Sequence, residues 1–167
     1  MTWVYEGAVE TGTEPFEAFF ERERDGLFGA LVLMTGDRSE AEEIAQDAFL
    51  AVWERWDRVH LIDDPAAYLH RTAVNAFRKR NRRAATFRRV IALIPSRAPE
   101  TSSEGGLMLS EALAALTPRQ RAALVLTEML GYSGEETAEM LGIKASTVAA
   151  LKYQGRAALK ESEAADE

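Results

Sequence analysis

Apolar side chains recur every three or four residues along most of the chain, a spacing that places them on one face of an α-helix. In the first half this pattern predicts three helices, over residues 14–32, 37–53 and 64–83. In the second half it predicts four more, over residues 107–116, 118–130, 133–141 and 146–162. No segment shows the alternation of apolar and polar positions that is typical of strands. The sequence therefore predicts an all-α fold.

Residues that cap or interrupt helices stand at the ends of these segments. Pro15 suits the first turn of a helix, where its missing N–H costs nothing. Asp37 or Ser39 can cap the second helix, because a short side-chain oxygen there accepts a hydrogen bond from the first turn. Asp64, which precedes a proline, can cap the third helix in the same way. We expect residues 57–64 to be an irregular connector.

Proline, serine and glycine are concentrated in residues 95–106, a composition that is typical of a flexible linker. The chain is therefore expected to form two small helical domains joined by that linker. The predicted divisions are a loose lead at 1–13, a first domain at 14–92, the linker at 93–106, a second domain at 107–162 and a tail at 163–167.

Charge is distributed very unevenly. The chain of 167 residues has a net charge of -7, yet residues 71–97 contain nine basic side chains and no acidic one. Binding follows this local field more than the total. The absence of cysteine excludes disulfides and a cysteine nucleophile, and the two histidines are ten residues apart without a metal-binding pattern. No phosphate loop or nucleophile motif is present, so we expect no catalytic site, cofactor or metal.

The start of the chain lacks the basic end and apolar core of a signal peptide, and no apolar run approaches a membrane span. We expect a cytoplasmic protein.

The basic segment predicts nucleic-acid binding. Its cations can bind phosphates, and aromatic residues interleaved with them can stack on unpaired bases. The cations are Arg71, Arg78, Lys79, Arg80, Arg82, Arg83, Arg88 and Arg89, and the aromatic residues are Tyr68, Phe77 and Phe87. A solvated helix face is the structural alternative, and Phe77 is expected to belong to the core.

Residues 132–151 have the pattern of a helix-turn-helix. Ser133 and Glu136 form a capping box, and Gly142 stands where a tight turn needs a left-handed backbone. A second helix then begins at Ser146 or Thr147. In a helix-turn-helix this second helix enters the major groove of DNA. A purely structural helical hairpin is the alternative.

Four stretches in this order resemble the extracytoplasmic-function sigma factors of bacterial RNA polymerase. They are residues 33–53, residues 64–75, residues 113–126 and the helix-turn-helix, and the likeness spans about residues 14–160. The resemblance implies two DNA-binding helical domains, regions 2 and 4 of the family, and promoter-specific initiation of transcription without catalytic chemistry.

The resemblance assigns roles to named residues of region 2. The docking surface for the polymerase β′ clamp would comprise Glu43, Gln46, Asp47 and Leu50, while Phe49 and Trp53 are expected to be at least partly core. The −10 element of the promoter would be bound and melted by Arg71, Asn75, Arg78, Lys79 and Arg82. The loop from Val59 to Asp64 would hold a flipped base.

In region 4 the resemblance assigns the −35 element to Lys144, Ser146, Thr147, Lys152 and Arg156. The chain departs from the family here, because Ala149, Ala150, Leu151 and Gln154 stand where several basic residues are usual. Fewer phosphate contacts imply weaker binding that depends less on salt.

The implied partners are core polymerase (β′ clamp and β flap), promoter DNA and an anti-sigma protein, through which any membrane contact would be indirect; no small-molecule substrate is implied. A sigma-like chain that occupies polymerase without binding the −35 element is the main alternative. A repressor that uses only its helix-turn-helix would leave the first 90 residues unexplained.

Overall fold

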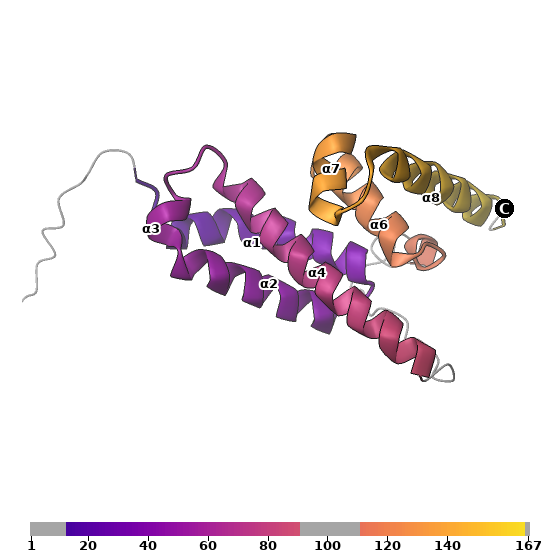
Figure 1. Cartoon of the computed structure of the whole chain (residues 1–167), viewed down its shortest axis with the longest axis horizontal. Coiled ribbons are helices and arrows are strands. Elements are labelled where there is room, and N and C mark those ends of the chain that lie inside the picture. Colours follow the sequence, from indigo (N-terminus) through magenta and orange to yellow (C-terminus); the bar gives the residue numbers. More distant parts are fainter. Residues whose placement is uncertain (1–12, 91–110, 166–167) are drawn as a thin grey trace, which may run out of the picture.

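A computed structural model describes residues 13–90 and 111–165, and these residues are helical apart from short connections. The all-α prediction is confirmed. The first bundle (Figure 1) contains α1 (Phe16–Thr35), α2 (Arg38–Glu54), α3 (Trp56–Val59) and α4 (Pro65–Val90). The second contains α6 (Pro118–Leu124), η1 (Val125–Met129), α7 (Gly134–Leu141) and α8 (Ala145–Ala165), with one helical turn before them at residues 111–114.

The polar caps predicted from the sequence are present at the starts of α2 and α4. The Asp37 side chain accepts a hydrogen bond from the backbone N–H of Glu40 at 3.2 Å, which fixes the start of α2. Asp64 accepts one from the N–H of Ala67 at 3.0 Å at the start of α4. Pro15 is the N-cap of α1 and lies just outside its first turn.

Several details differ from the sequence prediction. Helices α1 and α4 continue to Thr35 and Val90, past the predicted ends at residues 32 and 83. The connector at 57–64 is not wholly irregular, because it includes most of α3, whose Trp56 ring packs 4.8 Å from that of Phe19. Residues 125–129 form a π-helical turn instead of continuing α6. The last helix continues to Ala165, past the predicted end at residue 162. The predicted linker at 93–106 lies outside the described residues, as do most of the lead and the end of the tail.

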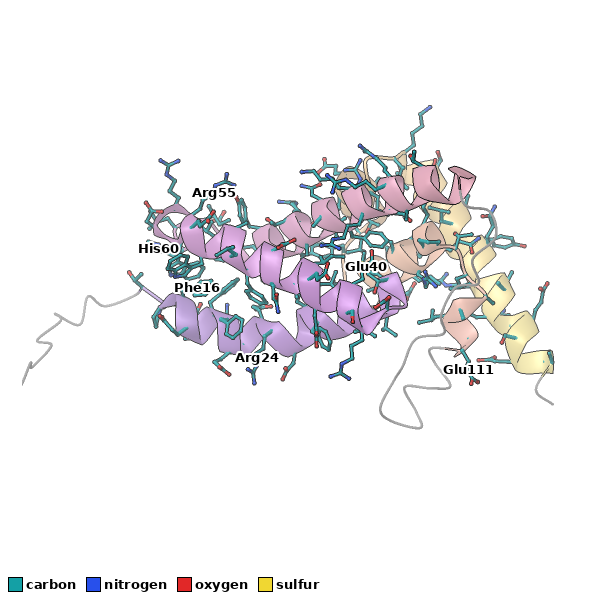
Figure 2. The ribbon with its side chains drawn as sticks, turned by 90° about the horizontal axis from the view of Figure 1, so that it is seen from below. Phe16, Arg24, Glu40, Arg55, His60 and Glu111 are labelled. Carbon is teal, nitrogen blue, oxygen red and sulfur yellow. The ribbon has the colours of Figure 1, made fainter. Side chains whose placement is uncertain are left out.

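The core of the first bundle lies where α1, α2 and α4 meet. Phe19, Ile44 and Leu69 are fully buried there, one from each helix. Phe77 of α4 is also buried, as expected. At one end of the bundle (Figure 2) the side chains of Phe16 and His60 gather around Trp56, with the Phe16 ring 5.6 Å from the Trp56 ring.

The second bundle has the expected helix-turn-helix. The capping box of Ser133 and Glu136 is formed in both directions at the start of α7. Gly142, with φ of 66°, ends α7 in the left-handed conformation that glycine adopts without strain. Gly155 lets α8 approach α6 closely, since a Cβ there would lie 2.9 Å from Cδ1 of Leu124.

The two bundles pack directly against each other. Leu126 of η1 and Met140 of α7 are buried in the same apolar cluster as Met34 of α1. Polar contacts surround this cluster: Arg121 Nε donates to the carbonyl of Met34 at 3.1 Å, and His70 Nδ1 lies 2.6 Å from the Tyr132 hydroxyl. The described chain is therefore a closed arrangement in which α7 rests on α4, as Figure 1 shows.

Acidification is expected to open this arrangement through His70. Burial lowers the pKa of His70, although the nearby carboxylates Glu23 and Asp64 oppose the shift, and Arg71 also faces the partner Tyr132. A depressed pKa means that the closed form binds fewer protons than the open form. Closure is then weakened as the pH falls below about 6.5, the ordinary pKa of histidine.

Because the chain has no cysteine, dyes attached to Arg58→Cys and Lys160→Cys can report the distance between the bundles by energy transfer. Transfer should decrease between pH 7.5 and 5.5, and His70→Gln should remove that response. The matched variant His60→Gln, which changes the other histidine, should keep it. If the labelled parent and both histidine variants responded to pH identically, titratable groups other than His70 would be responsible for the opening.

Candidate nucleic-acid interface

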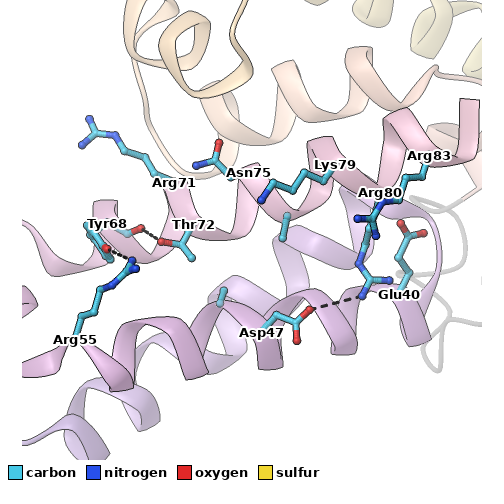
Figure 3. A pocket seen from close by; sticks show the side chains of 12 residues that line it. Glu40, Asp47, Arg55, Tyr68, Arg71, Thr72, Asn75, Lys79, Arg80 and Arg83 are labelled. Atoms are coloured by element: carbon cyan, nitrogen blue, oxygen red, sulfur yellow. Dashed lines mark hydrogen bonds and ion pairs between the residues drawn. The ribbon is translucent and has the colours of Figure 1, made fainter.

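A basic groove runs between α2 and α4. It encloses a cavity of about 840 Å³, and its cations are Arg55, Arg71, Lys79, Arg80 and Arg83. Figure 3 shows that Arg71, Asn75 and Lys79 project from α4 along one side of this groove. The amide of Asn75 can hydrogen-bond a base edge, while the cations can bind phosphates. The groove therefore has the chemistry of a single-stranded nucleic-acid site.

The five residues predicted for the −10 element do not share one surface. Arg71, Asn75 and Lys79 line the groove. Arg82 is exposed on α4 but is not among the groove residues. Arg78 faces the second bundle, where its guanidinium lies against Gly142 and Nη1 donates weakly to the carbonyl of Met140 at 3.5 Å. In the closed arrangement the half-buried Arg78 therefore contacts the second bundle and does not line the groove.

The groove includes residues that the sequence analysis did not assign to the −10 element. Arg80 and Arg83 belong to the basic segment but were not assigned to the site. Arg55 comes from the end of α2 and donates to the Tyr68 hydroxyl at 3.3 Å, a hydrogen bond that raises the pKa of Arg55. Only the packing of α2 on α4 brings Arg55 and Tyr68 together, so no local sequence pattern could have indicated that Arg55 lines the groove.

Acidic residues of α2 lie along the edge of this groove. Arg80 Nη1 donates to Glu43 Oε2 at 2.8 Å, and its Nη2 lies 3.7 Å from Asp47 Oδ2. Glu40, also at the groove, has a pKa raised by burial and by the neighbouring charge of Asp37. The acids offset part of the positive charge, and Arg80 is shared between the groove and α2.

The four residues predicted to bind polymerase lie on one exposed face of α2. Glu43 and Asp47 occupy the edge of that face beside α4, while Gln46 and Leu50 continue it away from the groove. Leu50 is 53% exposed. Trp53 adds a large apolar side chain that is 57% exposed, so the expectation that it is partly core is wrong.

Phe49 is core, as expected, because it turns inward and packs on Phe20 with ring centroids 4.8 Å apart. The outward-facing residues of α2 therefore offer apolar anchors among polar groups, the usual composition of a protein contact.

The residues predicted for the −35 element all lie at α8, but two of them are already paired. Lys144 and Ser146 are exposed at its start, and Thr147 is half-buried. Further along, Glu128 of η1 forms an ion pair with Arg156 and another with Lys152 Nζ at 3.4 Å. Burial alone would raise the pKa of Glu128, but these two cations outweigh it and hold that pKa below its usual value.

Glu128 is expected to compete with DNA phosphates for these two cations. In Glu128→Gln the charge of the carboxylate is lost, so the chain should bind duplex DNA several-fold more tightly at low salt. The slope of log affinity against log salt should steepen by one to two units, about one for each released cation. The measurement is fluorescence anisotropy of a labelled duplex over a salt series.

Glu161→Gln supplies the matched control, since Glu161 is an exposed acid near the far end of α8. If both variants change the slope equally, the effect is one of net charge and Glu128 has no special role.

Comparison with known families agrees with this geometry. The model of sigma-70 region 2 matches residues 19–87, which include the groove and the exposed face of α2. The model of sigma-70 region 4 matches residues 106–159, which include the helix-turn-helix.

Curated relatives are similar over most of their length. The ECF RNA polymerase sigma factor SigM of Mycobacterium tuberculosis is 30% identical over 146 residues, covering 86% of this chain and 74% of SigM. The RNA polymerase sigma-E factor of Streptomyces coelicolor is 27% identical over 150 residues, covering 87% and 84%.

Solved structures share the fold. CnrH, solved in complex with the cytosolic domain of CnrY, is 25% identical with a TM-score of 0.61, covering 91% of this chain and 89% of CnrH. The sigma factor RpoE of Bartonella quintana, solved in complex with the anti-sigma factor NepR, has a TM-score of 0.72 at 23% identity, covering 91% and 98%.

Proposed function

This chain belongs to the extracytoplasmic-function group of the sigma-70 family, with regions 2 and 4, and from that premise we propose which of its surfaces perform each step of initiation. Such a sigma factor directs RNA polymerase to specific promoters and is not an enzyme. The observation that supports the assignment best is the basic groove bordered by the exposed face of α2. Helix α2 there lies between the surface proposed to bind DNA and the surface proposed to bind polymerase.

The groove is proposed to hold the displaced non-template strand of the −10 element. Arg71, Lys79 and Arg83 would bind its phosphates, and Asn75 would hydrogen-bond a base. Tyr68, at the end of the groove near the connector, would stack on a base that leaves the helix. Melting then needs no bond-making chemistry, because the free energy of binding the unpaired strand offsets the cost of unstacking.

The exposed face of α2 is proposed to dock on the β′ clamp of core polymerase. Leu50 and Trp53 would be the apolar anchors, with Gln46 and Asp47 as polar neighbours. Glu43 and Asp47 also bind Arg80, so a partner that takes up these carboxylates would free Arg80 for a DNA phosphate. Docking and DNA binding would then favour each other.

Promoter binding requires the closed arrangement to open. The −10 and −35 elements are about 25 base pairs apart, which is ~85 Å of duplex at 3.4 Å per base pair. In the closed chain α4 and α8 both pack on α7, a helix of ~10 Å diameter, so the two DNA-binding helices lie far closer than that.

We also propose that an anti-sigma protein binds the closed arrangement of this chain. RpoE of Bartonella quintana was solved with the anti-sigma factor NepR bound, and CnrH with the cytosolic domain of CnrY bound. Any protein that binds the closed form better than the open form would hold this chain away from promoters. Since its proposed partners, RNA polymerase and promoter DNA, are in the cytoplasm, we propose that the chain functions there. Among the described helices, none is both long and apolar enough to cross a membrane.

In vitro transcription tests the proposal. Purified chain added to sigma-free core polymerase should give discrete transcripts from a fragmented genomic library of the source organism. The double variant Asn75→Ala and Lys79→Ala should reduce them at least tenfold, because each lost base or phosphate contact costs about 1 kcal/mol or more. Binding of that variant to core polymerase should stay unchanged.

Lys160→Ala is the matched control, since it removes a cation from the end of α8, far from the groove, and should leave transcription intact. Core binding without any transcript would favour a chain that only occupies polymerase, a reading that the paired state of Lys152 and Arg156 supports. Failure to bind core would overturn the assignment of α2.

A further inference from the structure

The outward face of the first turns of α8 carries small apolar side chains instead of charged ones. Ala149 and Ala150 are exposed there, flanked by Ser146 on one side and Tyr153 on the other. Tyr153 is 78% exposed, the largest value among the exposed large hydrophobic side chains of the described residues. No contact with the first bundle covers this face in the described residues, because the bundles meet through α6, η1 and α7.

The polar side chains further along α8 are turned to other partners. Lys152 and Arg156 bind Glu128, and Gln154 accepts a hydrogen bond from Gln120 Nε2 at 3.4 Å. The usual contact to guanine is a two-pronged one from arginine or lysine to O6 and N7. The outward face of the first turns of α8, from Ser146 to Tyr153, carries no such cation, and Lys144 is exposed just before the helix begins.

A methyl side chain can recognise one feature of the major groove. Only thymine displays a methyl group there, and alanine makes an apolar contact with it that no other base can replace. Because Ala149 and Ala150 are adjacent in sequence, they stand about 100° apart around the helix and reach neighbouring base pairs. Backbones approach closely at alanine, so the helix can also lie deep in the groove.

We propose that Ala149 and Ala150 determine −35 specificity by contacting thymine methyl groups, with the ring of Tyr153 packing against the same strand one turn further on. The −35 element of this sigma factor then contains thymine at two neighbouring positions, on one strand or divided between the two. The inference rests on the proposed role of α8 in promoter binding and adds the class of base that it selects.

Uracil provides a probe of the methyl group alone. The promoters recovered by the transcription experiment are resynthesised with deoxyuridine in place of thymidine, first throughout the −35 element and then one position at a time. Holoenzyme affinity is measured by competition against the unmodified promoter. At the contacted positions each lost methyl should weaken binding about two- to fivefold, the loss that corresponds to one buried methyl. The same exchange in the spacer should have no effect.

Protein variants separate this contact from the helix-stabilising effect of alanine. Ala149→Gly and Ala150→Gly remove the methyl partners, so each should reduce the ratio between the thymine and uracil promoters at its own position toward one. Ala157→Gly, at an exposed position of the same helix, has a comparable cost in helix propensity and should leave that ratio unchanged.

Equal binding of the thymine and uracil promoters by the unaltered chain would overturn the inference. So would promoters whose −35 element is composed of guanine and cytosine, or whose activity survives scrambling of that element. All three results leave promoter-specific transcription standing and are therefore distinct from failure of the proposed function. If the proposed function itself failed, no fragment would give a transcript, and the inference about the −35 element would fail with it.

Discussion

The apolar cluster that joins the two bundles is the contact on which the rest of the arrangement depends. Leu126 and Met140 bring the second bundle onto α1 and α4, and they are buried as completely as the core of the first bundle. Small helical domains bury too little surface to be very stable alone, so each bundle is supported by the other. The same contact half-buries Arg78 and brings the two helices that we propose to bind DNA close together. Stability of the free chain and promoter binding are thus in opposition.

Helix α4 carries this opposition within a single element. One face, with Leu69 and Phe77, is core; a second, with Asn75 and Lys79, lines the basic groove; a third, with His70 and Arg78, meets the second bundle. A helix has only 3.6 residues per turn, so three functions leave few positions for each. This explains why cations adjacent in sequence, such as Arg78 and Lys79, have different surroundings. A run of basic residues is a property of the sequence, whereas a binding surface is a property of the packed helix.

The features that could be predicted from the sequence are those set by short-range chemistry. Asp37, Asp64 and the capping box at Ser133 act within one helical turn, and the left-handed turn after α7 already requires a glycine at 142, so the pattern of neighbours was sufficient. The overall family also followed from the order of such local patterns. What could not be predicted depends on contacts between distant segments: Arg55 in the groove, Glu128 beside α8, the exposure of Trp53, and the docking of the bundles. The π-helical turn at 125–129 belongs with these, since the helix there meets α1.

Both surfaces proposed to bind DNA have acidic residues placed against their cations. Glu43 and Asp47 bind Arg80 at the groove, and Glu128 binds Lys152 and Arg156 at α8. Pairing of this kind contributes little to stability at an exposed surface. Its larger consequence is for DNA binding. A cation held by a carboxylate displaces fewer counterions from the phosphates, so non-specific binding to DNA is weaker. Non-specific sites outnumber promoters enormously, so lowering that background raises selectivity even when promoter affinity also falls. An acidic chain of net charge -7 with local basic surfaces is therefore suited to a protein whose binding to DNA must be selective for promoters.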